Sequence, residues 1–265
     1  MRKQWETGEK IITSAENPRI KRAQKLKTRK GRDREGLFLL EGKKLLLEAL
    51  KSKFRVEDIF ILDDGVNRNE LTELDAYGIK PTLVPAHIFK LLTETETPQG
   101  FLATVAKPEA QLPKSGSLVV LDRLQDPGNV GTMIRSADAA GFAGVIFVKG
   151  TVDPFAGKTV RAAAGAILRL PFYFAEDEAA VFSIVNAAGI RSFACTMFAE
   201  KSYTEADLRG DIALIVGNEG GGISQDFLAG AAERIYIPMR EQSESLNAAV
   251  AGSIFMFEKR RQDVG

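Results

Sequence analysis

Short apolar runs alternate with amphipathic stretches along most of the chain. From residue 37 onward this pattern predicts strands at 37–40, 56–62, 80–84 and 101–105, separated by helices at 43–50, 69–76 and 86–92. A chain that alternates strand and helix buries the faces of both by folding as a sheet covered by helices. The pattern therefore predicts a small α/β domain in the first part of the chain.

The alternation resumes at residue 118, and here the strands are apolar throughout. We expect strands at 118–121, 145–148, 192–195, 212–216 and 234–237, and helices at 130–140, 158–166, 178–188, 224–228 and 246–260. Continuous apolar strands are typical of a parallel sheet with helices on both faces. Residues 107–116 contain two prolines and few apolar positions, which is typical of a linker. The sequence thus predicts an N-terminal domain over 1–106 and a C-terminal parallel-sheet domain over 117–265.

The N-terminal region is strongly basic. Residues 1–35 carry 12 Lys and Arg against 5 Asp and Glu, a net charge of +7, whereas the remaining 230 residues carry a net charge of −6. Asn17 and Pro18 are suited to begin a helix over 19–27, which has only a narrow apolar stripe. Such a helix is either a binding surface for nucleic-acid phosphates or a solvated amphipathic helix. The candidate phosphate contacts are Arg19, Lys21, Arg22, Lys25 and Lys27.

The sequence also argues against several classes of protein and site. No apolar run approaches eighteen residues and the N-terminal residues are polar, so we expect no membrane span or secretory signal and a cytoplasmic location. A single cysteine, Cys195, and a single histidine, His87, predict no disulfide and no metal site. Gly157-Lys158-Thr159 resembles the end of a phosphate loop but lacks its first glycine, and Gly128 with Gly131 is half a dinucleotide fingerprint. Neither predicts nucleotide binding.

Candidate chemistry lies after the strands of the second domain. The strand at 212–216 ends in Gly217-Asn218-Glu219-Gly220-Gly221-Gly222, and the strand at 234–237 ends in Pro238-Met239. Parallel sheets bind ligands at the carboxyl ends of their strands, and glycine lets the backbone approach a ligand closely. Taken alone, the glycines also fit a flexible connection. A third polar stretch, 122–141, follows the strand at 118–121 and shifts the balance toward a site.

These three stretches resemble the signature motifs of the SpoU (TrmH-like) ribose methyltransferases of the SPOUT superfamily. The first motif contains Asn129 and Arg135; the second is Gly217-Asn218-Glu219 with Gly222; the third is Ile237-Pro238-Met239 followed by Ser245-Leu246-Asn247. Residues 17–21, 38–42 and 97–100 resemble the L30e-like substrate-binding domain of one branch of the family. The resemblance covers almost the whole chain.

The resemblance implies transfer of a methyl group from S-adenosylmethionine to a ribose 2′-hydroxyl of RNA, with 23S ribosomal RNA as the expected substrate and no metal. It also implies a deep trefoil knot in the C-terminal domain. Homodimers are expected through the last helix, whose apolar residues cover more than one face. In such dimers each active site includes residues of the partner subunit.

Residue roles follow from the matched motif positions. The expected cofactor contacts are Thr196, Gly217, Asn218, Ile237, Met239, Ser245, Leu246 and Asn247. The expected catalytic residues are Arg135, Asn129 and Glu219. A guanidinium is a poor base, so we expect Arg135 to hold a phosphate and to stabilise negative charge on the 2′-oxygen. Asn129 is expected to cap its helix and orient Arg135 or the ribose, Glu219 to pair with Arg135 or hold the substrate, and Ser245 to cap the last helix.

Two other functions stay open at this point. The basic N-terminal region and the unusually polar loop at Arg240-Glu241 fit a catalytically silent RNA-binding or ribosome-assembly factor. A base N-methyltransferase of the same superfamily is the other alternative. The target nucleotide cannot be predicted, because RNA specificity depends on surface shape and stacking that no short motif encodes.

Overall fold

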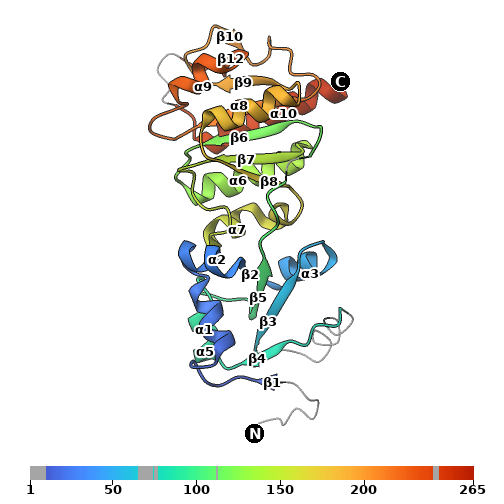
Figure 1. Cartoon of the computed structure of the whole chain (residues 1–265), viewed down its shortest axis with the longest axis vertical. Helices are drawn as coiled ribbons and strands as arrows, with labels where there is room; N and C mark the ends of the chain where they lie inside the picture. Colours follow the sequence, from blue (N-terminus) through green and yellow to red (C-terminus); the bar gives the residue numbers. More distant parts are fainter. Residues whose placement is uncertain (1–9, 65–73, 75–76, 112, 241–244) are drawn as a thin grey trace. The chain divides into compact units, whose positions relative to one another are not determined.

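The structure is a computed structural model that describes residues 10–64, 74, 77–111, 113–240 and 245–265. It divides into two compact units (Figure 1). The first comprises Met1–Lys107 with Phe155–Arg161, and the second comprises Pro108–Pro154 with Ala162–Gly265. Both are α/β units, as the alternating pattern predicts.

The first unit is built on a mixed five-stranded sheet in the order β1-β4-β3-β5-β2. Its strands are β1 (Lys10–Ile11), β2 (Leu37–Glu41), β3 (Val56–Leu62), β4 (Thr82–Val84) and β5 (Phe101–Ala106). β5 is antiparallel to both β2 and β3, whereas β4 is parallel to β3 and β1.

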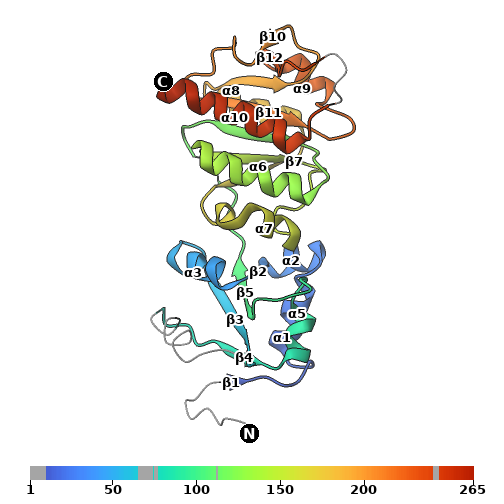
Figure 2. The ribbon, with the colours of Figure 1, turned by 180° about the vertical axis from the view of Figure 1, so that it is seen from behind.

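Helices cover both faces of this sheet: α1 (Pro18–Lys25) and α5 (Ala86–Leu92) lie on one side and α3 (Lys43–Lys51) on the other (Figures 1 and 2). The narrow apolar stripe of α1 is fully buried, and its residues pack with α5 and the sheet in one core. α2 (Arg29–Glu35) follows α1 directly and was not predicted. The stripe therefore anchors α1, and its remaining surface carries the basic side chains.

The second unit is built on a seven-stranded sheet in the order β10-β12-β9-β11-β6-β7-β8, and all its pairings are parallel. Its strands are β6 (Leu118–Asp122), β7 (Gly144–Val148), β8 (Phe172–Ala175), β9 (Arg191–Cys195), β10 (Lys201–Ser202), β11 (Ile212–Gly217) and β12 (Glu233–Tyr236). Every residue of β6, β7 and β11 is buried. The carboxyl ends of the strands consequently share one edge of the sheet.

Helices α6 (Pro127–Ala140) and α10 (Ala248–Val264) pack side by side on one face, and α8 (Glu178–Ala187) and α9 (Gln225–Gly230) cover the other (Figures 1 and 2). Small residues allow the close packing of α6 and α10. A side chain at Gly252 would place its Cβ 3.2 Å from the Met133 terminal methyl, and Ser136 and Ser253 share a hydrogen bond of 2.8 Å. α6 and α10 begin at the sheet edge that carries the strand ends.

Two helix starts differ from the prediction. Asp126, not Asn129, caps α6: its side chain accepts a hydrogen bond of 2.8 Å from the Asn129 amide, and Pro127 occupies the first turn. Asn247, not Ser245, caps α10 by accepting from the Ala249 amide at 2.9 Å. Both predictions were wrong because apolar positions do not mark these helix starts: α6 begins three residues before Val130, whereas α10 begins two residues after Leu246.

Other differences concern short or interrupted elements. The predicted helix at 158–166 is split into α7 (Gly157–Ala163) and a 3-10 helix (Ala164–Leu168), with Ala164 at a φ of 49° between them. β1, β8 and β10 were not predicted, and all three lie at sheet edges, where little or no apolar run is needed. The predicted helix at 69–76 falls almost wholly outside the described residues, as does Glu241.

Candidate active site

A cavity of about 520 Å³ lies at the carboxyl ends of β9, β11 and β12. Its walls are Cys195–Phe198 after β9, Val216–Ile223 around the end of β11, Ile237 and Met239 after β12, and residues of the first turns of α10. All eight predicted cofactor contacts, from Thr196 to Asn247, line this one cavity, and Glu219 does so too. Its volume is that of a site for a small organic ligand.

The loop after β11 closes on itself directly beside the cavity. Asn218 and Gly222 exchange two backbone hydrogen bonds of 3.0 and 2.9 Å, and Gly222 has a φ of 67°, which favours glycine. At Gly217 an added Cβ would lie 2.3 Å from the Gly222 carbonyl carbon. Gly217 is therefore required by the fold of the loop, since no side chain fits there.

One chain of hydrogen bonds joins the three polar stretches of the site. The Asn129 side chain donates to Glu219 Oε1 at 2.9 Å, and the Asn247 side chain donates to Asn129 Oδ1 at 2.9 Å. Glu219 also accepts from the backbone amides of Gln125, at 3.2 Å, and Asp126, at 3.4 Å. The glycine loop, the start of α6 and the start of α10 thus hold one another in place.

Glu219 is the charged centre of this network. Partial burial raises its pKa, but hydrogen bonds from the Asn129 side chain and from the Gln125 and Asp126 amides outweigh burial, so that the pKa lies below its ordinary value. Glu219 is consequently an anion at neutral pH.

Arg135 lies apart from this network. It is exposed on α6, and it forms no hydrogen bond or ion pair with the residues that the structure describes. Six helical residues separate it from Asn129, which turns its side chain about 120° away around the helix axis. The expected pairing of Arg135 with Glu219 is absent within the described part of the chain, because Asn129 and two backbone amides already engage the carboxylate.

Four of the five basic side chains predicted to contact phosphates have intramolecular partners. Arg19 pairs with Asp58 at 2.7 Å, Lys21 pairs with Glu16, Arg22 pairs with Glu35 at 3.1 Å, and Lys27 donates to the Thr93 carbonyl at 2.8 Å. Lys25 is exposed and has no side-chain partner among the described residues. The cationic surface of α1 is therefore partly neutralised, and Lys25 is its most available charge.

Sequence reasoning missed several apolar side chains at the cavity, of which Met197 and Phe198 are the most exposed. Met197 and Phe198 line it, yet they are 52% and 80% exposed. They directly follow Thr196, just after the end of β9. Their position after a central strand could have predicted that they line the cavity. Among the described residues there is no cluster of His, Cys, Asp and Glu that could hold a metal ion. None of the described helices is long and apolar enough to cross a bilayer.

Comparison with known proteins assigns both parts of the chain. Residues 116–257 match the SpoU rRNA Methylase family, and residues 17–103 match the MRM3-like substrate binding domain. The chain is 38% identical over 251 residues to the 23S rRNA (guanosine(2553)-2′-O)-methyltransferase RlmP of Bacillus subtilis, covering 95% of this chain and 99% of that protein.

Solved structures with the same fold include two with a bound cofactor. The AdoMet-bound rRNA methyltransferase from Sinorhizobium meliloti superposes with a TM-score of 0.86 at 29% identity, over 97% of this chain and 99% of that chain. The SpoU methyltransferase AviRb from Streptomyces viridochromogenes, in complex with AdoMet, gives a TM-score of 0.85 at 26% identity, over 93% of this chain and 98% of that chain.

Proposed function

We propose that this chain, which belongs to the SpoU rRNA methylase family and is an S-adenosylmethionine-dependent rRNA 2′-O-methyltransferase, methylates a ribose of 23S ribosomal RNA. The donor binds in the cavity at the ends of β9, β11 and β12. The observation that carries this proposal is the convergence of all eight expected cofactor contacts on that cavity.

The residues present fit the donor. Gly217 lets the backbone approach a ligand closely, and Ile237, Met239 and Leu246 add apolar surface to the lining of the cavity. Ser245 and Asn247 bring polar side chains to the start of α10, where the helix dipole favours a negative group such as a carboxylate. When bound, the donor's sulfonium supplies the methyl group and loses its charge on transfer.

Arg135 provides electrostatic stabilisation to the substrate. A guanidinium can hold a phosphate with two hydrogen bonds and stabilise negative charge that develops on the 2′-oxygen. Asn129 and Glu219 support this role indirectly, since their hydrogen bonds fix the start of α6, the helix that carries Arg135.

The chain acts as a homodimer in which Arg135 of the partner subunit reaches the cavity. α10 exposes Val250, Phe257 and Val264, which are 49%, 49% and 65% exposed. Their spacing of seven residues places them along one side of the helix. A second copy of the chain would cover this apolar stripe, and α6 lies beside it. The side chain of Arg135 is turned away from the network of its own subunit. In a dimer it can act at the cavity of the other subunit instead.

Each part of the chain has a role in this function. Residues 1–106 form an L30e-like domain that binds RNA, with contacts from Arg19, Lys21, Arg22, Lys25 and Lys27; 107–116 are the linker; and 117–265 form the methyltransferase domain, whose C-terminal segment is threaded as a trefoil knot. The match of residues 17–103 to a substrate-binding domain supports the first of these roles. The cytoplasmic location stays a prediction from the sequence.

Transfer of labelled methyl groups tests this function. Purified protein is incubated with labelled S-adenosylmethionine and unmodified 23S ribosomal RNA, and the RNA is digested to nucleosides. We expect label in one 2′-O-methylated nucleoside, and loss of most of it with Arg135→Ala. Label on a base, or label only in transfer RNA, would contradict the proposal.

A further inference from the structure

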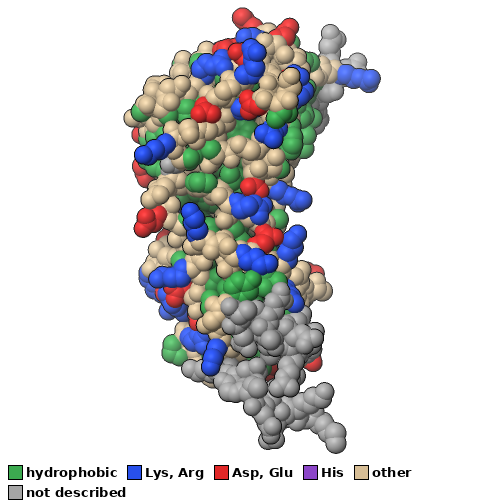
Figure 3. All heavy atoms as spheres, turned by 90° about the vertical axis from the view of Figure 1, so that its right-hand side faces the viewer, with side chains coloured by type: hydrophobic (Ala, Val, Ile, Leu, Met, Phe, Trp, Pro, Cys, Tyr) green, Lys and Arg blue, Asp and Glu red, His purple; other side chains and the backbone are tan. Residues whose placement is uncertain are grey.

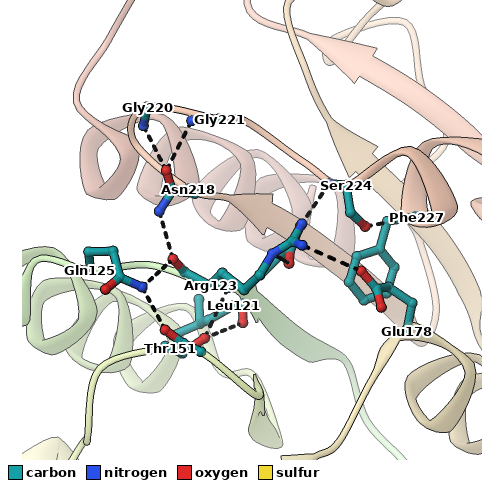
Figure 4. Close-up of polar contacts among 12 residues, drawn as sticks. Leu121, Arg123, Gln125, Thr151, Glu178, Asn218, Gly220, Gly221, Ser224 and Phe227 are labelled. Atoms are coloured by element: carbon teal, nitrogen blue, oxygen red, sulfur yellow. Dashed lines mark hydrogen bonds and ion pairs between the residues drawn. The ribbon is translucent and has the colours of Figure 1, made fainter.

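Two residues that do not line the cavity are hydrogen-bonded to its wall. Asp122 and Arg123 are consecutive residues at the end of β6, and neither is among the described residues of the cavity wall. Both are bonded to the segment that runs from the end of β11 to the start of α9, which forms one wall of the cavity. Figure 4 shows this group of contacts.

Arg123 is fixed in a backbone conformation that side chains rarely adopt, with a φ of 57°. Its amide donates to Thr151 Oγ1 at 3.1 Å, and its guanidinium pairs with Asp122 at 2.8 Å. Its carbonyl accepts from the Asn218 side chain at 2.7 Å and from the Gln125 side chain at 2.9 Å (Figure 4). These contacts hold the strained residue so that its carbonyl is presented to Asn218.

Asn218 uses both ends of its side-chain amide on protein groups. Its nitrogen donates to Arg123, while its oxygen accepts from the amides of Gly220, at 2.8 Å, and Gly221, at 3.0 Å. Figure 4 shows the side chain lying between the glycines and Arg123. Although Asn218 lies in the cavity wall, its side-chain oxygen is engaged by the two glycine amides and one N–H of its side chain is engaged by the Arg123 carbonyl.

Asp122 holds the other end of the same segment. Its side chain is fully buried, and Oδ2 accepts a hydrogen bond of 2.8 Å from the Ser224 amide. Ser224 in turn caps α9 by accepting from the Phe227 amide at 3.3 Å. A buried carboxylate is costly unless it is paired, and here both the Arg123 guanidinium and the Ser224 amide meet it.

We propose that Asp122, Arg123 and Asn218 are positioning residues for the methyl donor. They clamp the glycine loop at its start, through Asn218, and at its end, through Ser224, in the conformation that shapes the cavity. Asn218 acts as a link in this clamp and does not bind the donor with its side chain. The inference rests on the proposed function, because the ligand of the cavity is the donor.

Calorimetric titration of the full chain with S-adenosylmethionine tests the clamp. Asn218→Asp keeps an oxygen acceptor for the two glycine amides but replaces the donor to the Arg123 carbonyl with a second oxygen. Arg123→Ala removes the guanidinium that pairs with Asp122. Each variant is expected to weaken the Kd for the donor about tenfold. The two changes act at opposite ends of the clamp, so the double variant is expected to bind the donor at least as weakly as the weaker single variant.

Three controls separate positioning from a general loss of structure. Asn186→Asp makes the same chemical change at an exposed position on α8 and should leave the Kd unchanged. Arg123→Lys keeps a cation beside Asp122 and should bind the donor more tightly than Arg123→Ala. The KM for the donor should rise in each variant. The kcat, measured at saturating donor, should change less than the KM.

The outcomes are distinct. An unchanged Kd in Asn218→Asp or in Arg123→Ala overturns the clamp. If the wild-type protein itself fails to bind the donor, the proposed function is wrong, and that result is separate from either failure of the clamp.

Discussion

Glu219 shows how a single residue can serve the site through hydrogen bonds alone. Its carboxylate accepts from the Asn129 side chain and from two backbone amides at the start of α6, and these contacts lower its pKa despite partial burial. A group whose pKa is lowered by folding stabilises the fold above its unfolded pKa. That stabilisation is lost as the pH falls through the folded pKa.

Glu219→Gln is expected to make the melting temperature less dependent on pH. The difference in melting temperature between wild type and variant should be constant at neutral pH. It should shrink as the pH falls below the unfolded pKa of about 4.3. Scanning calorimetry of both proteins from neutral to acidic pH measures this difference in melting temperature. A difference that grows on acidification would mean that the pKa of Glu219 is raised in the folded protein.

Gly217 and Gly220 offer a matched pair within one loop. Gly217→Ala should destabilise the protein by about 1–3 kcal/mol, because its Cβ would overlap the Gly222 backbone. Gly220→Ala should have little effect on stability, since the nearest atom to its Cβ is Asn218 Oδ1 at 3.6 Å. Denaturant unfolding of both variants tests this. Equal losses would show that the loop is not packed as described.

Lys25, the last residue of α1, and Lys27, two residues further on, form a second matched pair. Lys25 is exposed, whereas the Lys27 ammonium donates to the Thr93 carbonyl. Lys25→Ala should weaken binding to ribosomal RNA and reduce the slope of log affinity against log salt by about 1. Lys27→Ala should affect the slope less and lower the melting temperature more. The reverse order would place the RNA on another surface.

At the scale of elements, the strands were easier to predict than the helix starts. The apolar runs that became β6, β7, β9 and β11 are buried central strands, so their composition alone marks them. The starts of α6 and α10 are set by the caps Asp126 and Asn247, and apolar periodicity does not detect these caps. The two-residue strands β1 and β10 are too short to carry a pattern.

The same distinction applies to the site. Three motifs that follow parallel strands predict that their residues meet. The second and third motifs do line one cavity, and Asn129 of the first is joined to them by hydrogen bonds to Glu219 and Asn247. The partners within it could not be predicted, because hydrogen bonds such as Asn218 to Arg123 join residues 95 positions apart. Such pairings depend on strand order, which places β6 next to β11.

The exposed stripe of α10 leads to a prediction at this scale. Phe257→Glu should convert the protein from dimer to monomer in light scattering and abolish most of the methyl transfer, because a charge is costly to bury in an apolar interface. Leu91→Glu is the matched control, since Leu91 is 39% exposed on α5 and is not part of the stripe. A Phe257→Glu protein that stays dimeric would place the interface elsewhere.

At the scale of the whole molecule, the proposed homodimer places two chains at each active site. The network of Asn129, Glu219 and Asn247 is complete within one chain, but Arg135 contacts none of it. The parallel sheet forms the cavity, and the N-terminal unit carries the basic helix. In the proposed homodimer the RNA meets a cavity of one subunit and Arg135 of the other.

Mixed dimers test this claim most directly. Arg135→Ala and Gly217→Ala chains with different tags are produced together, and the dimer that contains one of each is isolated and assayed for methyl transfer to 23S ribosomal RNA. If Arg135 serves the partner's cavity, one of the two sites in the mixed dimer has neither defect, and we expect about half of the wild-type activity, with almost none in either parent variant. A mixed dimer as inactive as its parents would contradict the account, because it would place Arg135 and the donor cavity of one site in the same chain.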